Sequence, residues 1–313
     1  MDKTPGEIIK TIIDFFKLAR APFHLVGILP FAAGSILANH IYGGFRTDVF
    51  LLGLAAVILI QAATYLNGEY FDYDVDELSA QHEKNRFSGG SQVLQKGIIP
   101  RKAALYAAWA AAIGAILIGL YICFPLGFGW TPLLLGAFGF IAGFFYSSKP
   151  FQWAYMGIGE GLIGVCYGWL PVAVAFFLQQ KRFHPAVHLC SLPIIFSIFN
   201  VIFINEFPDY IADRALGKKT LVVRLGKEIS GKFYAVISII TGITLVLALW
   251  GLGLFTPLVL LLAAPVLAVA ILNASWAFRE YYKDRVKLER LCAMTLIVNL
   301  GVNILFCVAF LLA

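Results

Sequence analysis

Apolar stretches long enough to cross a membrane recur along the whole chain and constrain its fold more than any other feature. A hydrocarbon core of about 30 Å needs roughly 20 apolar residues in a helix, and a backbone inside it must satisfy its own hydrogen bonds. Nine such stretches are found, at approximately 22–40, 48–66, 103–123, 132–146, 156–178, 188–205, 233–250, 255–275 and 291–312. The sequence therefore predicts an all-α integral membrane protein, with about nine transmembrane helices in a single domain over residues 1–313.

The composition agrees with this fold class. The chain is 60% hydrophobic and 13% charged, whereas soluble domains average about 25% charged residues. With nine membrane crossings, 21 of the 24 Lys and Arg residues lie on the same side of the membrane as the N-terminus. Only Arg46, Lys181 and Arg182 lie on the opposite side. Because Lys and Arg are retained on the cytoplasmic side, we expect a multi-pass protein of the cytoplasmic membrane with its N-terminus in the cytoplasm. The net charge of +6 then suits anionic lipid or phosphate, and no nucleic-acid partner is expected.

Carboxylates gather in two long polar connections on the basic side, after the second and the sixth apolar stretches. Both connections contain the pattern Glu-x-x-Asp-x-x-x-Asp, at Glu69, Asp72 and Asp76 and at Glu206, Asp209 and Asp213. On a continuous helix these positions share one face. At about 6 Å and an effective dielectric near 20, each like-charged pair costs about 2–3 kcal/mol, so a cation is expected to neutralise them. Oxygen ligands without His or Cys suit Mg²⁺, which commonly binds substrate phosphate as well.

The recurrence of the motif predicts an internal repeat of two four-helix units plus one extra helix. The two helices that end in the motifs would then face each other, and their opposed acidic stripes would hold two ions around one diphosphate. Pro208 lies within the second stripe and is expected to kink that helix, because proline lacks an N–H and its ring clashes with the preceding turn.

Basic residues and glycines near the motifs fit an anionic substrate. The loop from Lys84 to Gln92 contains two glycines, whose backbone N–H groups can approach phosphate, and Arg86, whose guanidinium offers a planar fork of donors. Lys149 and Lys218 are further candidates. For each of these basic residues, retention on the cytoplasmic side is an alternative explanation.

The sequence resembles a known family, the UbiA superfamily of intramembrane aromatic prenyltransferases, over essentially the whole chain. The resemblance rests on the two acidic motifs, at 67–76 and 205–213, and on the run DRALGKKTLVVRLG at 213–226, which is similar to the family pattern DxxxDxxxGKxTLxxRLG. The first motif departs from the family's Asn-Asp start, because Asn67 is one residue further from the carboxylates and Glu69 takes the first acidic position.

Within the superfamily, the chain is most similar to the MenA branch, which prenylates 1,4-dihydroxy-2-naphthoate in menaquinone synthesis. Three stretches carry this similarity: SGGSQVLQKG at 88–97, YSSKP at 146–150 and YMGIGE at 155–160. The Arg-Thr-x-x-Arg-Pro segment of 4-hydroxybenzoate prenyltransferases is absent after Asp76, which disfavours that neighbouring branch.

The resemblance implies Mg²⁺-dependent transfer of a polyprenyl group from a prenyl diphosphate to an aromatic acceptor, with 1,4-dihydroxy-2-naphthoate favoured. The catalytic residues would be Asp72, Asp76, Asp209 and Asp213. These four would bind Mg²⁺ together with Glu69 and Asn205, and the diphosphate would be bound by Arg86, Lys149 and Lys218. Asn67, Tyr146 and Glu160 would lie near the acceptor or shield an allylic cation. An N-terminal helix position explains Glu160 equally well.

Two alternatives stay open. One is a UbiA-like enzyme with another acceptor, such as 4-hydroxybenzoate, a lipid or a porphyrin-type ring. The other is a cation-coupled transporter, since nine helices and an internal repeat are also transporter features. Transport sites usually lie near the bilayer midplane at broken helices, whereas both acidic motifs follow apolar stretches at their ends, so the enzyme is favoured.

Overall fold

The computed structural model describes residues 5–82 and 85–313, and every regular element within these ranges is helical. Lys84, which opens the glycine-containing loop, lies outside the described residues. The spanning helices, in chain order, are α2 (Leu25–Tyr42), α3 (Thr47–Phe71), α5 (Arg101–Cys123), α6 (Thr131–Phe144), α7 and α8 (Gly159–Ile163 and Leu170–Gln180), α9 (Ala186–Asn205), α12 (Lys227–Gly251), α13 (Pro257–Phe278) and α14 (Arg285–Leu312).

All nine predicted apolar stretches form helices. Among the described residues, eight spans are long and apolar enough to cross a membrane, and the remaining predicted stretch, 132–146, forms the shorter helix α6, with 14 residues. At 1.5 Å per residue α6 is about 21 Å long. The fifth span runs from Gly159 to Gln180 and consists of α7, a π-helical segment η3 (Gly164–Trp169) and α8. The chain is therefore an all-α integral membrane protein.

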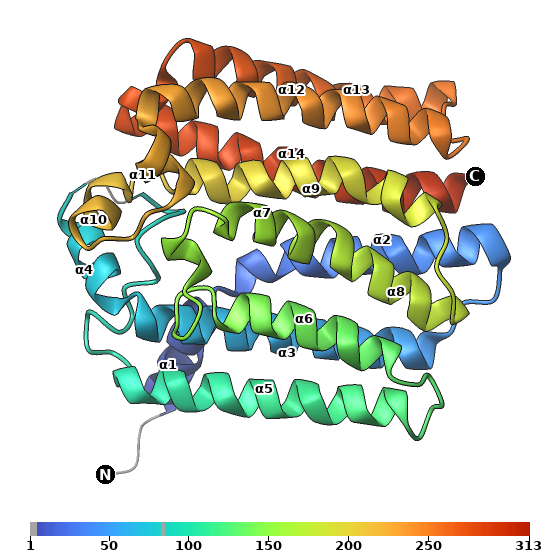
Figure 1. Ribbon diagram of the computed structural model, residues 1–313, viewed down its shortest axis with the longest axis horizontal. Coiled ribbons are helices and arrows are strands. Elements are labelled where there is room, and N and C mark those ends of the chain that lie inside the picture. Colours follow the sequence, from blue (N-terminus) through green and yellow to red (C-terminus); the bar gives the residue numbers. More distant parts are fainter. Residues whose placement is uncertain (1–4, 83–84) are drawn as a thin grey trace.

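The spanning helices lie side by side in one bundle (Figure 1). Helix α3 packs against α5, α2 against α8, and α9 against both α12 and α14. Glycines allow the closest approaches: a Cβ at Gly34 of α2 would lie 2.4 Å from the carbonyl oxygen of Val172, and one at Gly168 would lie 2.6 Å from Cα of Ile195. Small residues at such crossings let helix backbones pack tightly in lipid, where packing contacts drive helix association.

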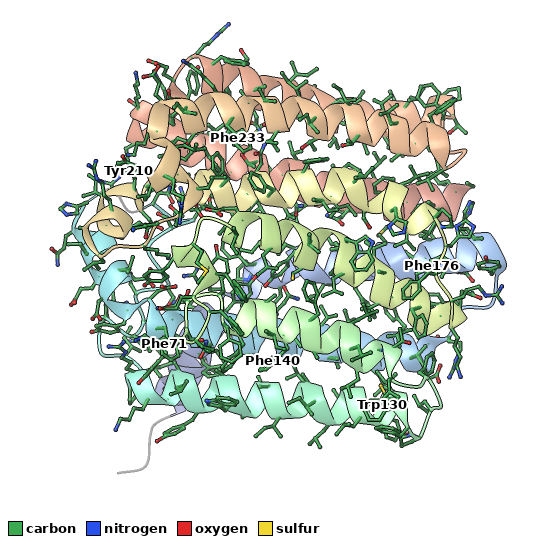
Figure 2. The ribbon with its side chains drawn as sticks, in the orientation of Figure 1. Phe71, Trp130, Phe140, Phe176, Tyr210 and Phe233 are labelled. Carbon is green, nitrogen blue, oxygen red and sulfur yellow. The ribbon has the colours of Figure 1, made fainter. Side chains whose placement is uncertain are left out.

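The short helices gather at one end of the bundle. They are α1 (Pro5–Leu18), α4 (Tyr73–Gln81), α10 (Tyr210–Ala215) and α11 (Leu221–Leu225), while short 3₁₀ turns lie at Ala21–His24, Trp153–Tyr155 and Tyr281–Lys283. The C-terminal end of α14 lies at the opposite end (Figure 1). Figure 2 shows the same polarity in its labelled side chains, since Phe71 and Tyr210 lie at the end with α4 and α10, and Trp130 lies at the other.

The chain order matches the predicted grouping of four helices, four helices and one. Each acidic motif follows the second helix of a group, α3 or α9, and each continues into a short helix, α4 or α10. Helices α4 and α10 contact each other, so the two motifs meet across the bundle axis. A symmetric internal repeat remains a prediction.

Candidate active site

Both acidic motifs are interrupted by a break in the helix, which corrects the expectation of two continuous helical stripes. Helix α3 ends at Phe71, Asp72 has φ −84° and ψ 10°, and α4 begins at Tyr73. The second motif breaks between the end of α9 at Asn205 and the start of α10 at Tyr210. Pro208 lies in that second break, where its missing N–H cannot continue the helix. The backbone bond from Asp72 N–H to the carbonyl of Gly68 (2.8 Å) is kept, so the chain changes direction without losing the turn.

The breaks turn carboxylates from the two motifs toward a common space. The Nζ of Lys218 lies 3.6 Å from Asp72 Oδ1 and 3.8 Å from Asp213 Oδ1, and so bridges the two motifs. The hydroxyl of Ser79, on α4, donates a hydrogen bond to Asp209. One cation and one hydroxyl thus join segments that lie more than 120 residues apart in the sequence.

A cavity of about 580 Å³ opens between these carboxylates and runs into the bundle. Along α3 its lining extends from Asp72 to Gly53, about 28 Å at 1.5 Å per residue. Its polar end is lined by Arg20, Glu69, Asp72, Asp76, Asn205, Glu206, Asp209, Asp213 and Lys218. Most of the remainder is apolar, with Val57, Ala115 and Leu133 among the lining residues. The shape is that of a long apolar channel with a charged mouth.

Several buried oxygens at the mouth lack a hydrogen-bond partner within the protein. They are Asp72 Oδ1, Asp76 Oδ2, Asn205 Oδ1, Glu206 Oε2 and Asp213 Oδ1. Unpartnered buried oxygens are costly, and a hard cation would satisfy them. Among the described residues, no three His, Cys, Asp or Glu side chains converge closely enough to hold an ion unaided. This open arrangement fits Mg²⁺, which keeps waters and takes substrate phosphate oxygens as ligands.

Burial raises the pKa values of four carboxyls at the mouth, those of Asp76, Glu206, Asp209 and Asp213. Burial raises the pKa of Asp213 to about 7, and neighbouring carboxylates add to the rise while Lys218 opposes it. The pKa of Asp76 is also raised, first by burial and then by Glu69. Burial therefore disfavours the charged form of these carboxyls, and a cation bound beside them would favour it.

Glu69 has a different environment from the other carboxylates. Its Oε1 accepts a hydrogen bond from Arg20 Nε at 2.8 Å, and both its oxygens accept from Ser91, from the backbone N–H at 2.9 and 3.2 Å and from the hydroxyl at 2.7 Å. Glu69 therefore anchors the glycine-containing loop to α3, and the protein already supplies partners for its two oxygens. Arg20 was not predicted as a site residue, because a single basic residue before an apolar stretch is explained by topology alone.

The loop also depends on a glycine beside Asp76. Gly90 has φ +63°, and a Cβ there would lie 2.1 Å from Asp76 Oδ2. Gly97 offers a matched comparison, since it has φ +66° with no atom within 4 Å of a Cβ.

We expect Gly90→Ala to lower the free energy of unfolding by about 2 kcal/mol more than Gly97→Ala, because only the first adds a steric clash to the backbone strain. Thermal unfolding of both variants in the same detergent measures this difference. Equal apparent Tm values would show that Asp76 moves aside without cost.

Of the three predicted diphosphate-binding residues, only Lys218 lines the cavity. The Arg86 side chain is 86% exposed and pairs with Glu289 at 2.7 Å, which draws it toward α14. Lys149 is exposed and does not line the cavity. The structure therefore places Arg86 and Lys149 outside the cavity, and diphosphate binding by these two residues stays a prediction. Arg20 and Lys218 are the Lys and Arg side chains that the described structure brings to the cavity.

Of the three residues predicted near the acceptor, only Tyr146 lines the cavity. Tyr146 lines the cavity, and its ring packs against Gly159, where a Cβ would lie 2.8 Å from the ring. Asn67 does not line the cavity; its amide donates to the carbonyl of Phe144 (2.6 Å) and so ties α3 to the end of α6. Glu160, in the first turn of α7, accepts a hydrogen bond from the backbone N–H of Leu221 at 2.6 Å. Asn67 and Glu160 thus hold neighbouring segments in place.

The sequence matches a known protein family and several of its characterised members. Residues 27–299 match the UbiA prenyltransferase family. The chain is 30% identical to the 1,4-dihydroxy-2-naphthoate octaprenyltransferase of Escherichia coli (strain K12) over 82% of this chain and 83% of that enzyme. It is also 30% identical to the enzyme of the same description from Bacillus subtilis (strain 168), over 68% of this chain and 66%, just under two thirds, of that enzyme.

Solved structures share the fold at lower identity. A UbiA homolog from Aeropyrum pernix K1, solved in the apo form, superposes with a TM-score of 0.70 at 17% identity, covering 92% of this chain and 97% of that one. A UbiA homolog from Archaeoglobus fulgidus bound to GPP and Mg²⁺ superposes with a TM-score of 0.59 at 18% identity, covering 94% and 99%. The family match covers most of the chain, and the relatives at 30% identity extend over at least two thirds of it. The chain therefore belongs to the UbiA prenyltransferase family, in the branch of the 1,4-dihydroxy-2-naphthoate octaprenyltransferases, MenA.

Proposed function

We propose that this protein transfers a polyprenyl group from a prenyl diphosphate to 1,4-dihydroxy-2-naphthoate, in a reaction that depends on Mg²⁺. The observation that carries the proposal is a charged mouth of two opposed acidic motifs and Lys218, opening on a long apolar cavity. A prenyl diphosphate has the same division, a dianionic or trianionic head and an apolar tail. The acceptor is proposed from the similarity to the naphthoate octaprenyltransferases.

The Mg²⁺ ligands that we propose are Asp72, Asp76, Asp209 and Asp213, together with Asn205. Four of these five residues carry a buried oxygen without a hydrogen-bond partner in the protein, which supports this choice. We also propose Glu206, because it lines the cavity and one of its oxygens lacks a partner. Glu69 is proposed to act by holding the loop at Ser91 and Arg20 at the mouth. Bound Mg²⁺ would stabilise the negative charge of the diphosphate as it departs.

The chain's own residues would perform the remaining steps. Lys218 would hold a diphosphate oxygen between the two motifs and neutralise the charge that develops when the bond between C1 and oxygen breaks. Tyr146, at the cavity wall, would present its ring to the allylic cation that remains. The acceptor ring carbon that carries the carboxylate then forms the new carbon–carbon bond, and loss of that carboxylate as CO₂ restores the aromatic ring. The apolar walls exclude water, which would otherwise capture the cation.

The apolar part of the cavity would hold the prenyl tail. The whole cavity, with its charged mouth, is about 28 Å long along α3, close to the thickness of a hydrocarbon core, so the tail would run along the spanning helices toward lipid. We propose that the end with the acidic motifs faces the cytoplasm, because the basic residues concentrate on that side of the topology. The soluble acceptor and the diphosphate product would enter and leave there.

The hydrogen bond from Leu221 to Glu160 is proposed to support binding of the prenyl diphosphate through Lys218. Lys218 lies three residues before Leu221, so loss of the Glu160 carboxylate should release the segment that carries Lys218. We expect Glu160→Ala to raise KM for the prenyl diphosphate about tenfold, as for loss of one charge-assisted hydrogen bond, with KM for the naphthoate unchanged. Glu228→Ala is the control, because Glu228 is exposed and pairs with Lys232 on α12. A rise in KM for the naphthoate alone would instead place Glu160 at the acceptor.

Direct assay tests the proposed function. Purified protein in detergent is incubated with geranylgeranyl diphosphate, Mg²⁺ and either 1,4-dihydroxy-2-naphthoate or 4-hydroxybenzoate, and the prenylated product is extracted and quantified. We expect product with the naphthoate and none with the hydroxybenzoate, and none after addition of EDTA until Mg²⁺ is restored. Product with the hydroxybenzoate alone would overturn the acceptor, and undiminished product in EDTA would overturn the role of Mg²⁺.

A further inference from the structure

One polar side chain lies deep in the apolar part of the cavity with no partner in the protein. Gln61, on α3, is 3% exposed and lines the cavity. Both its Oε1 and its Nε2 are buried without a hydrogen bond, and in the described part of the chain no other side chain has two such atoms. A buried carboxamide that leaves a donor and an acceptor unused is costly within a membrane span. A ligand group that both donates and accepts a hydrogen bond would offset this cost.

Gln61 lies on the same face of α3 as the acidic residues at the mouth, deeper in the cavity. Residues 61, 65, 69 and 72 lie on one face of α3, so Gln61 is on the stripe that ends at Asp72. It is eleven residues from Asp72, or about 16 Å deeper along the helix at 1.5 Å per residue. This interval exceeds the length of a diphosphate and leaves room for a fused aromatic ring.

The neighbouring helix is shaped around the carboxamide. A Cβ at Gly27 of α2 would lie 2.6 Å from Gln61 Nε2 and 2.9 Å from Oε1. The amide therefore lies flat against a glycine, which gives it space but no hydrogen-bonding side chain. Val26, Tyr167 and Ile198 also line the cavity and pack together in one cluster. Tyr65 lies one turn nearer the mouth, and its hydroxyl contacts the carbonyl of Phe23 at 3.4 Å.

The chemistry of an amide limits what this position can recognise. A prenyl tail has no polar atom and gives Gln61 nothing to bind. A carboxylate at this depth would need a cation, and the cavity's cations, Arg20 and Lys218, lie at the mouth. A hydroxyl is the matching group, because it donates one hydrogen bond and accepts another, as the carboxamide does.

We propose that Gln61 is a specificity-determining residue for the acceptor, and that its carboxamide exchanges hydrogen bonds with one ring hydroxyl of a dihydroxylated aromatic acid. This inference rests on the proposed function and adds to it the group that selects the acceptor. The ring lies between Gln61 and the mouth, with its carboxylate toward Arg20 and Lys218. A site built to bond a hydroxyl rejects an analogue without it, because the site's polar atoms are then left unpaired.

Equilibrium binding tests the inference separately from turnover. The dissociation constants of 1,4-dihydroxy-2-naphthoate, 1-hydroxy-2-naphthoate and 4-hydroxy-2-naphthoate are measured by titration calorimetry in detergent, for the unmodified protein and for Gln61→Met and Gln61→Leu. We expect the unmodified protein to bind the dihydroxy acid at least about tenfold more tightly than one of the monohydroxy acids, and both variants to lose this preference. The dissociation constant of geranylgeranyl diphosphate should stay within twofold in the variants. Gln180→Met, at the far end of α8, is the control and should keep the preference.

Three outcomes would overturn the inference. The unmodified protein shows no preference between the acids, or both variants keep it, or the variants lose donor and acceptor affinity equally, as general damage to the fold would cause. Turnover by the unmodified protein keeps these failures distinct from failure of the proposed function. Prenylated naphthoate formed by a protein whose variants keep the preference would leave the function standing and remove only Gln61 from acceptor selection.

Discussion

Asp72→Asn is expected to lower kcat/KM by at least about 10³-fold, the equivalent of roughly 4 kcal/mol of transition-state stabilisation. Asp72 lines the cavity at the helix break, its Oδ1 has no hydrogen-bond partner, and the Ser147 hydroxyl donates to its other oxygen. Asparagine keeps the shape and the bond from Ser147 but removes the charge that would bind Mg²⁺. The loss should therefore appear in turnover, while the variant still inserts and unfolds near the temperature of the unmodified protein.

Asp74→Asn is the matched control, because Asp74 is an exposed carboxylate on the same short helix α4 and does not line the cavity. It removes the same charge two residues away and should retain activity within about twofold, as surface substitutions usually do. Steady-state kinetics at saturating Mg²⁺ measures both variants. Full activity in Asp72→Asn, or equal losses in the two variants, would remove Asp72 from the metal site.

Lys218→Met is expected to lower kcat by about 10²–10³-fold, the usual cost of removing one preorganised group that stabilises developing negative charge. The Lys218 ammonium is the described cation that reaches both acidic motifs, at 3.6 Å from Asp72 and 3.8 Å from Asp213. Its loss leaves the departing diphosphate with less positive charge. Methionine retains most of the apolar stem, so packing changes little.

Lys219→Met supplies the control, since Lys219 is the adjacent residue and is exposed. Both variants replace one Lys by Met and so have the same net charge. They differ in position, because Lys218 lines the cavity and Lys219 does not. Kinetic measurement over a range of donor and Mg²⁺ concentrations separates binding from turnover. A Lys218→Met variant no worse than Lys219→Met would show that the diphosphate is neutralised elsewhere, and Arg20 would be the next candidate.

The membrane fold was predictable from sequence because each spanning helix carries its own signal. A stretch such as 233–250 or 291–312 is recognisable without knowledge of its neighbours, and all nine predicted stretches are helical. The π-helical segment at Gly164–Trp169 was not predicted. It depends on how the helix packs against others, and residue hydropathy carries no information about that.

The site was predictable to the level of its motifs. The spacing of Asp72 and Asp76, and of Asp209 and Asp213, indicated two acidic segments, and the structure brings both to one cavity. The basic residues were harder to place, because Arg86, Lys149 and Lys218 look alike in a sequence and only the fold decides which one faces inward. Arg20 and Gln61 show the converse. Each reaches the cavity from a segment whose local pattern gives no sign of it, since a single polar residue in or beside an apolar stretch becomes informative only when its partners are known.

The central claim is that the two acidic motifs bind the metal and the diphosphate together, and a structure with both ligands tests it most directly. The protein would be crystallised with Mn²⁺ in place of Mg²⁺ and with an unreactive thio analogue of geranylgeranyl diphosphate, and the metal located by its anomalous scattering. We expect metal peaks within about 2.0–2.3 Å of carboxylate oxygens from both motifs, with the diphosphate between them and beside Lys218. Metal peaks bound by only one motif, or a diphosphate away from both, would contradict the account.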